Sequence, residues 1–262
     1  MGNQRTRMED AERGEEDSTN DFQEGRSSLQ DQRYMSREKG GLPMVSKEER
    51  PYIIINCAAS ADGKIALPDK RQVRISSKED FDRVMRLREE CDAVLVGIGT
   101  VLTDDPKLNV KYDTSKQPAK VVLDTKLRIP EDAEVFKGGT KVYILTGKDV
   151  ERTIEKENAE VLRCNLSKDG LIDLKEAMKL LREKGIKRLL VEGGATVIWN
   201  FLKEGLFDEF NIYISPIIIG GAKTPTIADG DGVKNENEII KLRLKEVKKL
   251  GDGLLIRYEP WK

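Results

Sequence analysis

The pattern of apolar and polar positions changes abruptly near residue 50. The first 50 residues show no sustained helical or strand period, whereas short apolar runs alternate with amphipathic stretches from there onward. Five runs are nearly continuous in hydrophobicity, as strands covered on both faces are. They lie at residues 52–55, 93–96, 121–123, 142–145 and 189–191. This pattern predicts the buried strands of a largely parallel sheet.

Helical patterns separate these runs. The stretch 77–91 opens with a Ser-x-x-Asp cap at Ser77 and repeats apolar residues at helical spacing from Phe81 onward. Two further helices are expected over residues 173–184 and 195–204, each followed by a glycine that can end a helix.

After residue 208 the apolar positions alternate with a period of two, and a closing hairpin follows with its turn at residues 251–253. The residues expected to oppose one another in this hairpin are Leu242 and Leu244 on one strand and Leu254, Ile256 and Tyr258 on the other. Alternating β and α units that end in antiparallel strands predict an α/β fold class. We expect a mixed sheet, mostly parallel with a C-terminal antiparallel hairpin, and helices on both faces.

Two unequal parts follow from these patterns. Residues 1–50 are rich in charged residues, Gln, Ser and Gly, and bury too little apolar surface to offset their ordering entropy, which predicts a disordered charged extension. A solvated tail, a targeting segment and a regulatory arm all remain open for it. Residues 51–262 are expected to form one domain.

Composition narrows the possible chemistry. The net charge is -1, so a nucleic-acid binder driven by bulk charge is not expected. The chain has no histidine, which excludes histidine-ligated metal and Ser–His or Cys–His catalysis. Cys57, Cys91 and Cys164 form no close pair and are expected to be buried in a reducing compartment. No apolar segment approaches the roughly 20 residues that span a bilayer. We therefore expect a cytoplasmic protein.

The most informative motif is Glu192-Gly193-Gly194, where a buried strand passes through a glycine pair into a helix. Glycines there let the backbone approach a ligand, and a helix start favours a phosphate or pyrophosphate. A tight structural turn is the alternative. Glu192 favours the ligand site, because a carboxylate at the end of a buried strand needs a partner.

A second cluster, G-I-G-T-V-L-T-D-D-P at residues 97–106, also follows a strand. As a dinucleotide fingerprint it is weak, because Leu102 replaces the third glycine. Glycines, the Thr100 hydroxyl and two carboxylates favour a ligand loop. A structural turn capped by Asp104 or Asp105 would explain the carboxylates almost as well.

Two further features involve charge. Arg88 lies on the same helical stripe as Phe81, so its guanidinium needs an anion, either an internal carboxylate or a bound phosphate that Lys107 and Lys111 would share.

Near the first strand, residues 58–64 offer small side chains, with room for a flat ring, before Asp62, Gly63 and Lys64. A plain surface turn is the alternative, because Asp-Gly is a common turn pair.

Together these clusters resemble the reductase of riboflavin biosynthesis, in the stand-alone form found in archaea and related to the reductase half of the bacterial bifunctional deaminase-reductase. The resemblance covers residues 51–260. It rests on five motifs in order, which are Ser60-x-Asp62-Gly63-Lys64, Arg74-Ile75-Ser76, Gly99-Thr100-Val101-Leu102-x-Asp104-Asp105-Pro106, Val191-Glu192-Gly193-Gly194, and Pro216 followed by Gly220-Gly221.

The resemblance implies a dihydrofolate-reductase-like fold and hydride transfer from NADPH to the sugar C1′ of 2,5-diamino-6-ribosylamino-4(3H)-pyrimidinone 5′-phosphate. It also implies a homodimer, which the apolar stretch 212–219 would support. Without histidine the chain lacks the family's zinc deaminase site and would need a separate deaminase. Alternatives are the deaminated substrate, another pteridine or pyrimidine, and a nucleotide-binding protein without turnover.

The resemblance also assigns residues. NADPH would contact Ala58, Arg74, Thr100, Asp104, Thr125, Gly194, Ala195, Thr196, Val197, Ile198, Trp199 and Asn200. The substrate would contact Arg88, Leu108, Lys111 and Glu192, with the two cations at its phosphate. Lys111 stands where bacterial relatives carry arginine, so the point charge of an ammonium group replaces the forked guanidinium group. Asp62, Lys64 or Glu192 would assist proton transfer, directly or through water.

Overall fold

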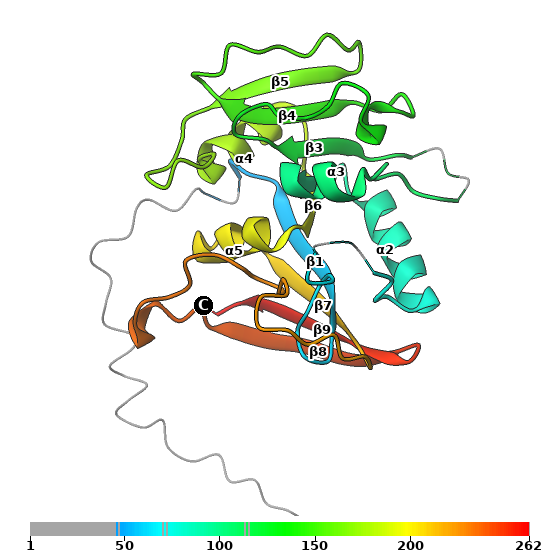
Figure 1. Cartoon of the computed structure of the whole chain (residues 1–262). Coiled ribbons are helices and arrows are strands. Elements are labelled where there is room, and N and C mark those ends of the chain that lie inside the picture. Colours follow the sequence, from blue (N-terminus) through cyan, green and yellow to red (C-terminus); the bar gives the residue numbers. More distant parts are fainter. Residues whose placement is uncertain are drawn as a thin grey trace, which may run out of the picture. The chain divides into compact units, whose positions relative to one another are not determined.

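The computed structural model describes residues 46, 48–69, 71, 73–112, 114 and 116–261. The extension predicted over residues 1–50 lies almost entirely outside the described residues. The helices are α2 (Lys78–Glu90), α3 (Ile98–Asp104), α4 (Leu174–Glu183) and α5 (Ala195–Lys203), with short 3-10 turns at Glu134–Phe136 and Glu236–Glu238. The strands, shown in Figure 1, are β1 (Tyr52–Ser60), β2 (Ala93–Gly97), β3 (Ala119–Leu123), β4 (Val142–Gly147), β5 (Ala159–Cys164), β6 (Arg188–Gly193), β7 (Glu209–Ser215), β8 (Leu242–Leu250) and β9 (Gly253–Pro260).

In the described part of the chain the strands form a nine-stranded sheet in the order β5-β4-β3-β2-β6-β1-β7-β9-β8. Neighbours from β5 to β7 are parallel. Strand β9 runs antiparallel to both β7 and β8. The predicted mixed sheet with a C-terminal antiparallel hairpin is therefore confirmed.

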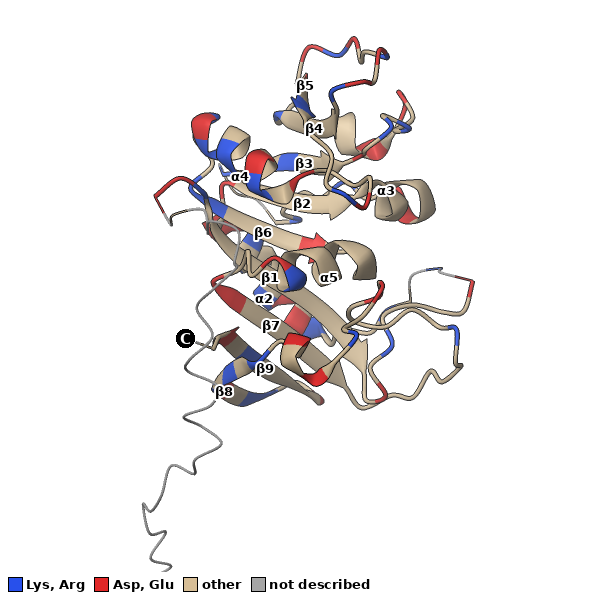
Figure 2. Ribbon diagram, turned by 90° about the vertical axis from the view of Figure 1, so that its left-hand side faces the viewer, with Lys and Arg blue, Asp and Glu red and all other residues tan. Residues whose placement is uncertain are grey.

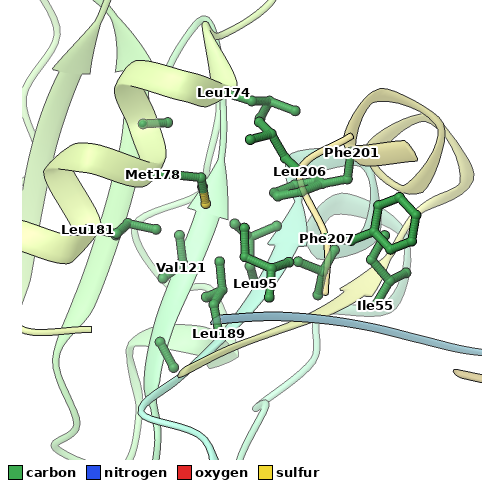
Figure 3. Close-up of a cluster of buried hydrophobic side chains, with 14 of the residues drawn as sticks. Ile55, Leu95, Val121, Leu174, Met178, Leu181, Leu189, Phe201, Leu206 and Phe207 are labelled. Carbon is green, nitrogen blue, oxygen red and sulfur yellow. The ribbon is translucent and has the colours of Figure 1, made fainter. Parts of the chain in front are cut away.

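Helices cover both faces of the sheet, as Figure 1 shows. On one face α4 and α5 pack on the larger core, where Met178 and Phe201 meet strand residues such as Leu95 and Leu189 (Figure 3). On the other face α3 contributes Ile98 to a second core. Because successive strand residues point to opposite faces and both faces are covered, the central strands are largely apolar.

Most predicted elements are present. The Ser77 hydroxyl accepts the Asp80 N–H at 3.2 Å, as the predicted cap requires. The three cysteines are buried, as expected. The loop conformation predicted for residues 97–106 is wrong, because residues 98–104 form helix α3. Ile98 and Val101 of this helix are buried in the second core, which stabilises a helix too short to show a period. The edge strand β5 was not predicted.

The sheet topology creates a crevice between two neighbouring strands. Strand β2 continues into α3 on one face, whereas β6 continues into α5 on the opposite face. The chain therefore separates at the carboxyl ends of β2 and β6. Ligands of open α/β sheets bind at such a switch point.

Charge is distributed evenly over the described elements. Figure 2 shows Lys and Arg interspersed with Asp and Glu along the helices and strands. No helix in the described ranges combines the length and the apolar character needed to cross a membrane.

Candidate active site

A cleft of about 1130 Å³ opens at this carboxyl edge of the sheet. Four parallel strands contribute to its lining near their ends, through Ala58 of β1, Gly97 of β2, Leu123 of β3 and Gly193 of β6. A volume of this size exceeds that of a typical small-ligand pocket. The cleft has room for a dinucleotide beside a second ligand.

The start of α5 forms one wall of the cleft. Gly193 and Gly194 have φ angles of +122° and +33°, which ordinary side chains rarely adopt. A Cβ on Gly194 would lie 3.5 Å from the Thr100 hydroxyl oxygen. Gly194 is the N-cap residue of α5 and gives it no side-chain cap, so the N–H groups of the first turn remain for a ligand. With the helix dipole, they suit an anion.

Glu192 reaches the cleft through a β-bulge. Leu95 of β2 pairs with Val191 and Val96 pairs with Gly193, so Glu192 is the extra residue between the two registers. Such bulges re-aim side chains beside active sites. Glu192 lines the cleft, and its side chain is only 11% exposed.

Arg88 binds Glu192 as a fork. Its Nε and Nη2 donate to the two carboxylate oxygens at 2.7 and 2.6 Å, and Nη1 donates to the Asn109 carbonyl at 2.9 Å. Burial lowers the pKa of Arg88, but the charge and hydrogen bonds of Glu192 outweigh burial and leave that pKa raised. Of the two anions considered from sequence, the structure contains the internal carboxylate. A contact between Arg88 and a substrate phosphate stays a prediction.

Asp62 binds protein groups. It accepts the Ser60 hydroxyl at 2.6 Å and the N–H groups of Ile219 and Gly220 at 3.1 and 2.7 Å. These bonds, the Ser60 hydroxyl first, lower the pKa of Asp62 to about 2. Asp62 joins two loops beside the cleft and is not among the lining residues.

Lys64 also lies outside the lining, with Nζ donating to the Thr224 carbonyl at 3.3 Å. Glu192 is thus the predicted catalytic residue that lines the cleft. The roles of Asp62 and Lys64 stay predictions.

Most residues predicted to contact the cofactor gather in this cleft. Those that line it are Ala58, Arg74, Thr100, Asp104, Thr125, Gly194, Ala195, Thr196, Val197, Ile198 and Asn200. Trp199 differs, because it is not among the lining residues and its indole N–H donates to Asp231 at 2.7 Å. The structure thus brings eleven of the twelve predicted cofactor residues to one cleft. Their contacts with a cofactor stay a prediction.

The other predicted substrate residues, Arg88, Leu108 and Lys111, are not among the residues that line this cleft. The Lys111 ammonium lies 5.1 Å from the centre of the Phe81 ring, and Phe81 itself lines the cleft. Leu108 is buried and has a φ of +56°, an unusual value for a bulky residue. Lys107 faces Glu134 at 3.4 Å. Lys111 therefore contacts a residue that lines the cleft.

Sequence reasoning missed a turn at one end of the cleft. Asp124 is buried at the end of β3 and accepts the Ile129 N–H at 2.8 Å, which closes the turn that carries Thr125 and Arg128. Arg128 lines the cleft, with Nε 3.7 Å from Asp124. Burial raises the pKa of Asp124. The D-T-x-L-R string directly after a strand was the available signal.

Other parts of the cleft wall come from segments that are distant from this turn in the sequence. These lining residues are Ser167, Asp169, Leu171, Ile172, Lys203 and Glu204. Among the described residues, no group of three or more acidic or cysteine side chains could hold a metal ion.

Comparison with known proteins decides the family. The family model of the RibD C-terminal domain matches residues 51–256 of the sequence. The chain belongs to the RibD C-terminal domain family. Within this family it is 36% identical over 217 residues to the 2,5-diamino-6-ribosylamino-4(3H)-pyrimidinone 5′-phosphate reductase of Archaeoglobus fulgidus, covering 79% of this chain and 97% of that protein. It is 38% identical over 215 residues to the reductase of the same name from Methanothermobacter thermautotrophicus, covering 80% and 98%.

A solved RibD-family structure shares the fold. The Thermotoga maritima diaminohydroxyphosphoribosylaminopyrimidine deaminase/5-amino-6-(5-phosphoribosylamino)uracil reductase matches with a TM-score of 0.70 and 26% identity, over 82% of this chain. This chain spans 58% of that protein's length. The dihydrofolate-reductase-like architecture expected from the sequence agrees with this similarity.

Proposed function

We propose that this chain reduces the ribosylamino group of 2,5-diamino-6-ribosylamino-4(3H)-pyrimidinone 5′-phosphate to the ribitylamino group, with NADPH as the reductant. One observation carries the proposal. The uncapped start of α5 and the bulged Glu192 face the same cleft, so an anion site and a carboxylate lie side by side. The proposal is supported by two stand-alone reductases that the chain matches over nearly their whole length.

The cofactor would lie along α3 and α5. The N–H groups at the start of α5 would bind its pyrophosphate, and the absence of side chains at Gly193 and Gly194 leaves space for close approach. Thr100 and Asp104 would bind its polar groups from α3. When bound, the dinucleotide supplies the hydride. The protein then has to align the two ligands and exclude water from their reacting atoms.

Preference for NADPH would depend on cations at the ends of the cleft. Arg128 belongs to the turn that carries Thr125, and Arg74 also lines the cleft. A guanidinium binds a phosphate through two parallel hydrogen bonds. NADPH carries such a phosphate on its ribose, whereas NADH does not.

The substrate would lie beside Glu192. Small residues such as Ala58 and Ala66 line the wall and leave room for a flat pyrimidine, and Phe81 offers an aromatic face. Lys111, above that ring, would attract the 5′-phosphate. Glu192 would contact the reacting part of the sugar. Asp62 and Lys64, which belong to loops next to the cleft, would act on proton transfer only through water.

A steady-state assay of NADPH oxidation tests the proposal. The substrates are the diamino pyrimidine 5′-phosphate, its dephosphorylated form and the deaminated 5′-phosphate. We expect the diamino phosphate to have the highest kcat/KM and Glu192→Gln to lower kcat about tenfold or more. Glu183→Gln, an exposed carboxylate on α4, is the matched control. No oxidation with any substrate, or full activity of Glu192→Gln, contradicts the proposal.

The proposed enzyme is a homodimer in the cytoplasm, where its three free thiols stay reduced. Only the second half of the stretch 212–219 is exposed, including Ile218. A better surface lies on the hairpin, where Leu244, Val247 and Leu254 are 57%, 53% and 43% exposed. Leu244 pairs with Tyr258 and Val247 with Ile256, and the bulge between Leu244 and Glu246 brings both apolar residues to one face.

In the homodimer, this apolar face would pack against the same face of the second copy, so both faces would be removed from water. Light scattering after size exclusion should give a dimer for the wild type and a monomer for Val247→Glu. Lys248→Glu, on the opposite face of β8, should remain a dimer. A wild-type monomer contradicts this part of the proposal.

A further inference from the structure

A segment of the connection between β7 and β8 lies against the start of α5 (Figure 1). We call residues 216–232 the strap. The Asp229 N–H donates to the Ala195 carbonyl at 3.3 Å, and Ile227 packs against the larger core. The Asp229 carboxylate closes a turn, because it accepts the N–H and the hydroxyl of Thr226 at 3.1 and 2.5 Å. The middle of the strap is therefore a fixed turn beside the proposed dinucleotide wall.

The strap is also fastened to the loop that follows β1. The Ile65 N–H donates to the Pro225 carbonyl at 3.1 Å, and an isolated β-bridge pairs Lys64 with Thr226. The two backbone bonds to Asp62 described above hold the first part of the strap. Ile65 and Pro225 both line the cleft. The strap and this loop therefore contribute together to the cleft wall.

Trp199 clamps the strap from the side of α5. Its indole Nε1 donates to one carboxylate oxygen of Asp231 at 2.7 Å, and Lys203 Nζ lies 3.1 Å from the other. A Cβ on Gly230 would overlap the indole Cδ1 and lie 2.6 Å from Nε1, so the strap backbone approaches the ring as only glycine allows. The sequence neighbours of Trp199 on both sides line the cleft, whereas Trp199 does not. Its side chain thus contacts the strap.

We propose that Trp199 is a positioning residue for the pyrimidine side of the cleft, which clamps the strap to α5 so that the strap holds the loop after β1 in place. This inference rests on the proposed function. It assigns Trp199 a contact with the strap in place of the contact with NADPH that the family resemblance implies. The strap connects the proposed dinucleotide wall to the proposed pyrimidine wall through few residues, so Trp199 acts on the substrate although it belongs to the cofactor helix.

The reaction is sensitive to such a connection. Hydride transfer requires the two reacting carbons to lie about 3–3.5 Å apart, and small misplacements cost rate. When the clamp is lost, the strap and the loop after β1 shift, and the pyrimidine binds less tightly and out of alignment. NADPH alone keeps its affinity, because its proposed contacts on α3 and α5 are unchanged.

A double-mutant cycle tests the inference. We expect Trp199→Ala and Gly230→Ala each to lower kcat/KM for the diamino pyrimidine 5′-phosphate about tenfold, with an unchanged NADPH Kd by fluorescence titration. Gly230→Ala/Trp199→Ala should be about as active as Trp199→Ala alone, because the added methyl group occupies the space that the ring vacates. Lys223→Ala, at an exposed position of the strap, is the control and should keep wild-type kinetics.

Tryptophan fluorescence reports on the clamp without turnover. Trp199 and Trp261 are the two tryptophans of the chain, so Trp261→Phe leaves the Trp199 signal alone. In that background Gly230→Ala should increase quenching of Trp199 by acrylamide, because the displaced strap uncovers the ring. Thermal unfolding shows which variants fold, and if Trp199→Ala does not, Asp231→Ala, at an exposed position, replaces it in the kinetic comparison.

Two results overturn the inference while the proposed function stands. One is a weakened NADPH Kd in Trp199→Ala with unchanged KM for the pyrimidine, which would make Trp199 a cofactor contact. The other is additive losses in the cycle, which would mean that Trp199 and Gly230 act independently. A wild type that reduces none of the pyrimidines overturns both proposals.

Discussion

Arg50 and Asp208, which lie 158 positions apart in the chain, form a buried bidentate ion pair. The two pairs of atoms are 2.6 and 3.1 Å apart, and the side chains are 6% and 4% exposed. Asp208 also accepts the N–H of Ile53 at 2.9 Å. The pair therefore fastens the beginning of β1 to the segment that enters β7, at the edge of the sheet opposite the cleft.

Removing Arg50 should destabilise the fold strongly. Arg50→Met removes the guanidinium that pairs with the buried Asp208 carboxylate, and we expect a loss of about 3–5 kcal/mol in the free energy of unfolding. Urea titration measures it. Arg71→Met, which breaks an exposed pair with Asp69, is the control and should cost about 0–1 kcal/mol. Equal losses for the two variants would contradict the role assigned to burial.

Asp62 should make stability depend on pH in the acid range. Its pKa is lowered to about 2 in the folded state, against about 3.9 for an unperturbed aspartate. A lowered folded pKa stabilises the protein above the unfolded value, and this contribution disappears as pH falls through the folded value. The Tm difference between wild type and Asp62→Asn should thus be constant near neutral pH and shrink below about pH 4.

Ser60→Ala removes the hydroxyl that is the largest cause of this shift, so the Asp62 carboxyl should titrate at higher pH by carbon NMR. A Tm difference that grows on acidification would contradict the assignment.

Gly193 should not tolerate a side chain. Its φ of +122° is strained for any other residue, although a Cβ would meet nothing closer than Ile198 at 3.8 Å. We expect Gly193→Ala to lower the free energy of unfolding by about 1–3 kcal/mol and to weaken NADPH binding. Gly99→Ala in α3 has open space and no positive φ, so it should leave the free energy of unfolding unchanged or raise it, and it serves as the control for stability only. Denaturant unfolding and NADPH fluorescence titration check the two effects.

Arg128 should govern the choice between the two nicotinamide dinucleotides. We expect Arg128→Gln to lower kcat/KM for NADPH about tenfold or more while changing that for NADH little, because only NADPH carries the additional phosphate. Lys126→Gln, an exposed residue of the same turn that is not among the cleft residues, is the control. An equal loss with both cofactors would mean that Arg128 does not recognise that phosphate.

Local sequence signals predicted the elements that carry a clear period or cap. Ser77 caps α2 as predicted, and Asp173, near which the second predicted helix begins, caps α4, because such caps depend only on neighbouring N–H groups. Helix α3 and strand β5 were missed. α3 is seven residues long and is stabilised by packing in the core, and β5 is defined by its pairing with β4. Neither depends on a local period.

The sequence by itself determined that apolar strands end in glycines, carboxylates and hydroxyls, which predicted a ligand site at the carboxyl edge of a sheet. It left the anion of Arg88 open. Only the tertiary structure chose Glu192, 104 positions away, through a bulge and a strained turn. The physical reason is that a buried charge binds whichever opposite charge folding brings within hydrogen-bond distance, and distance along the chain does not determine that.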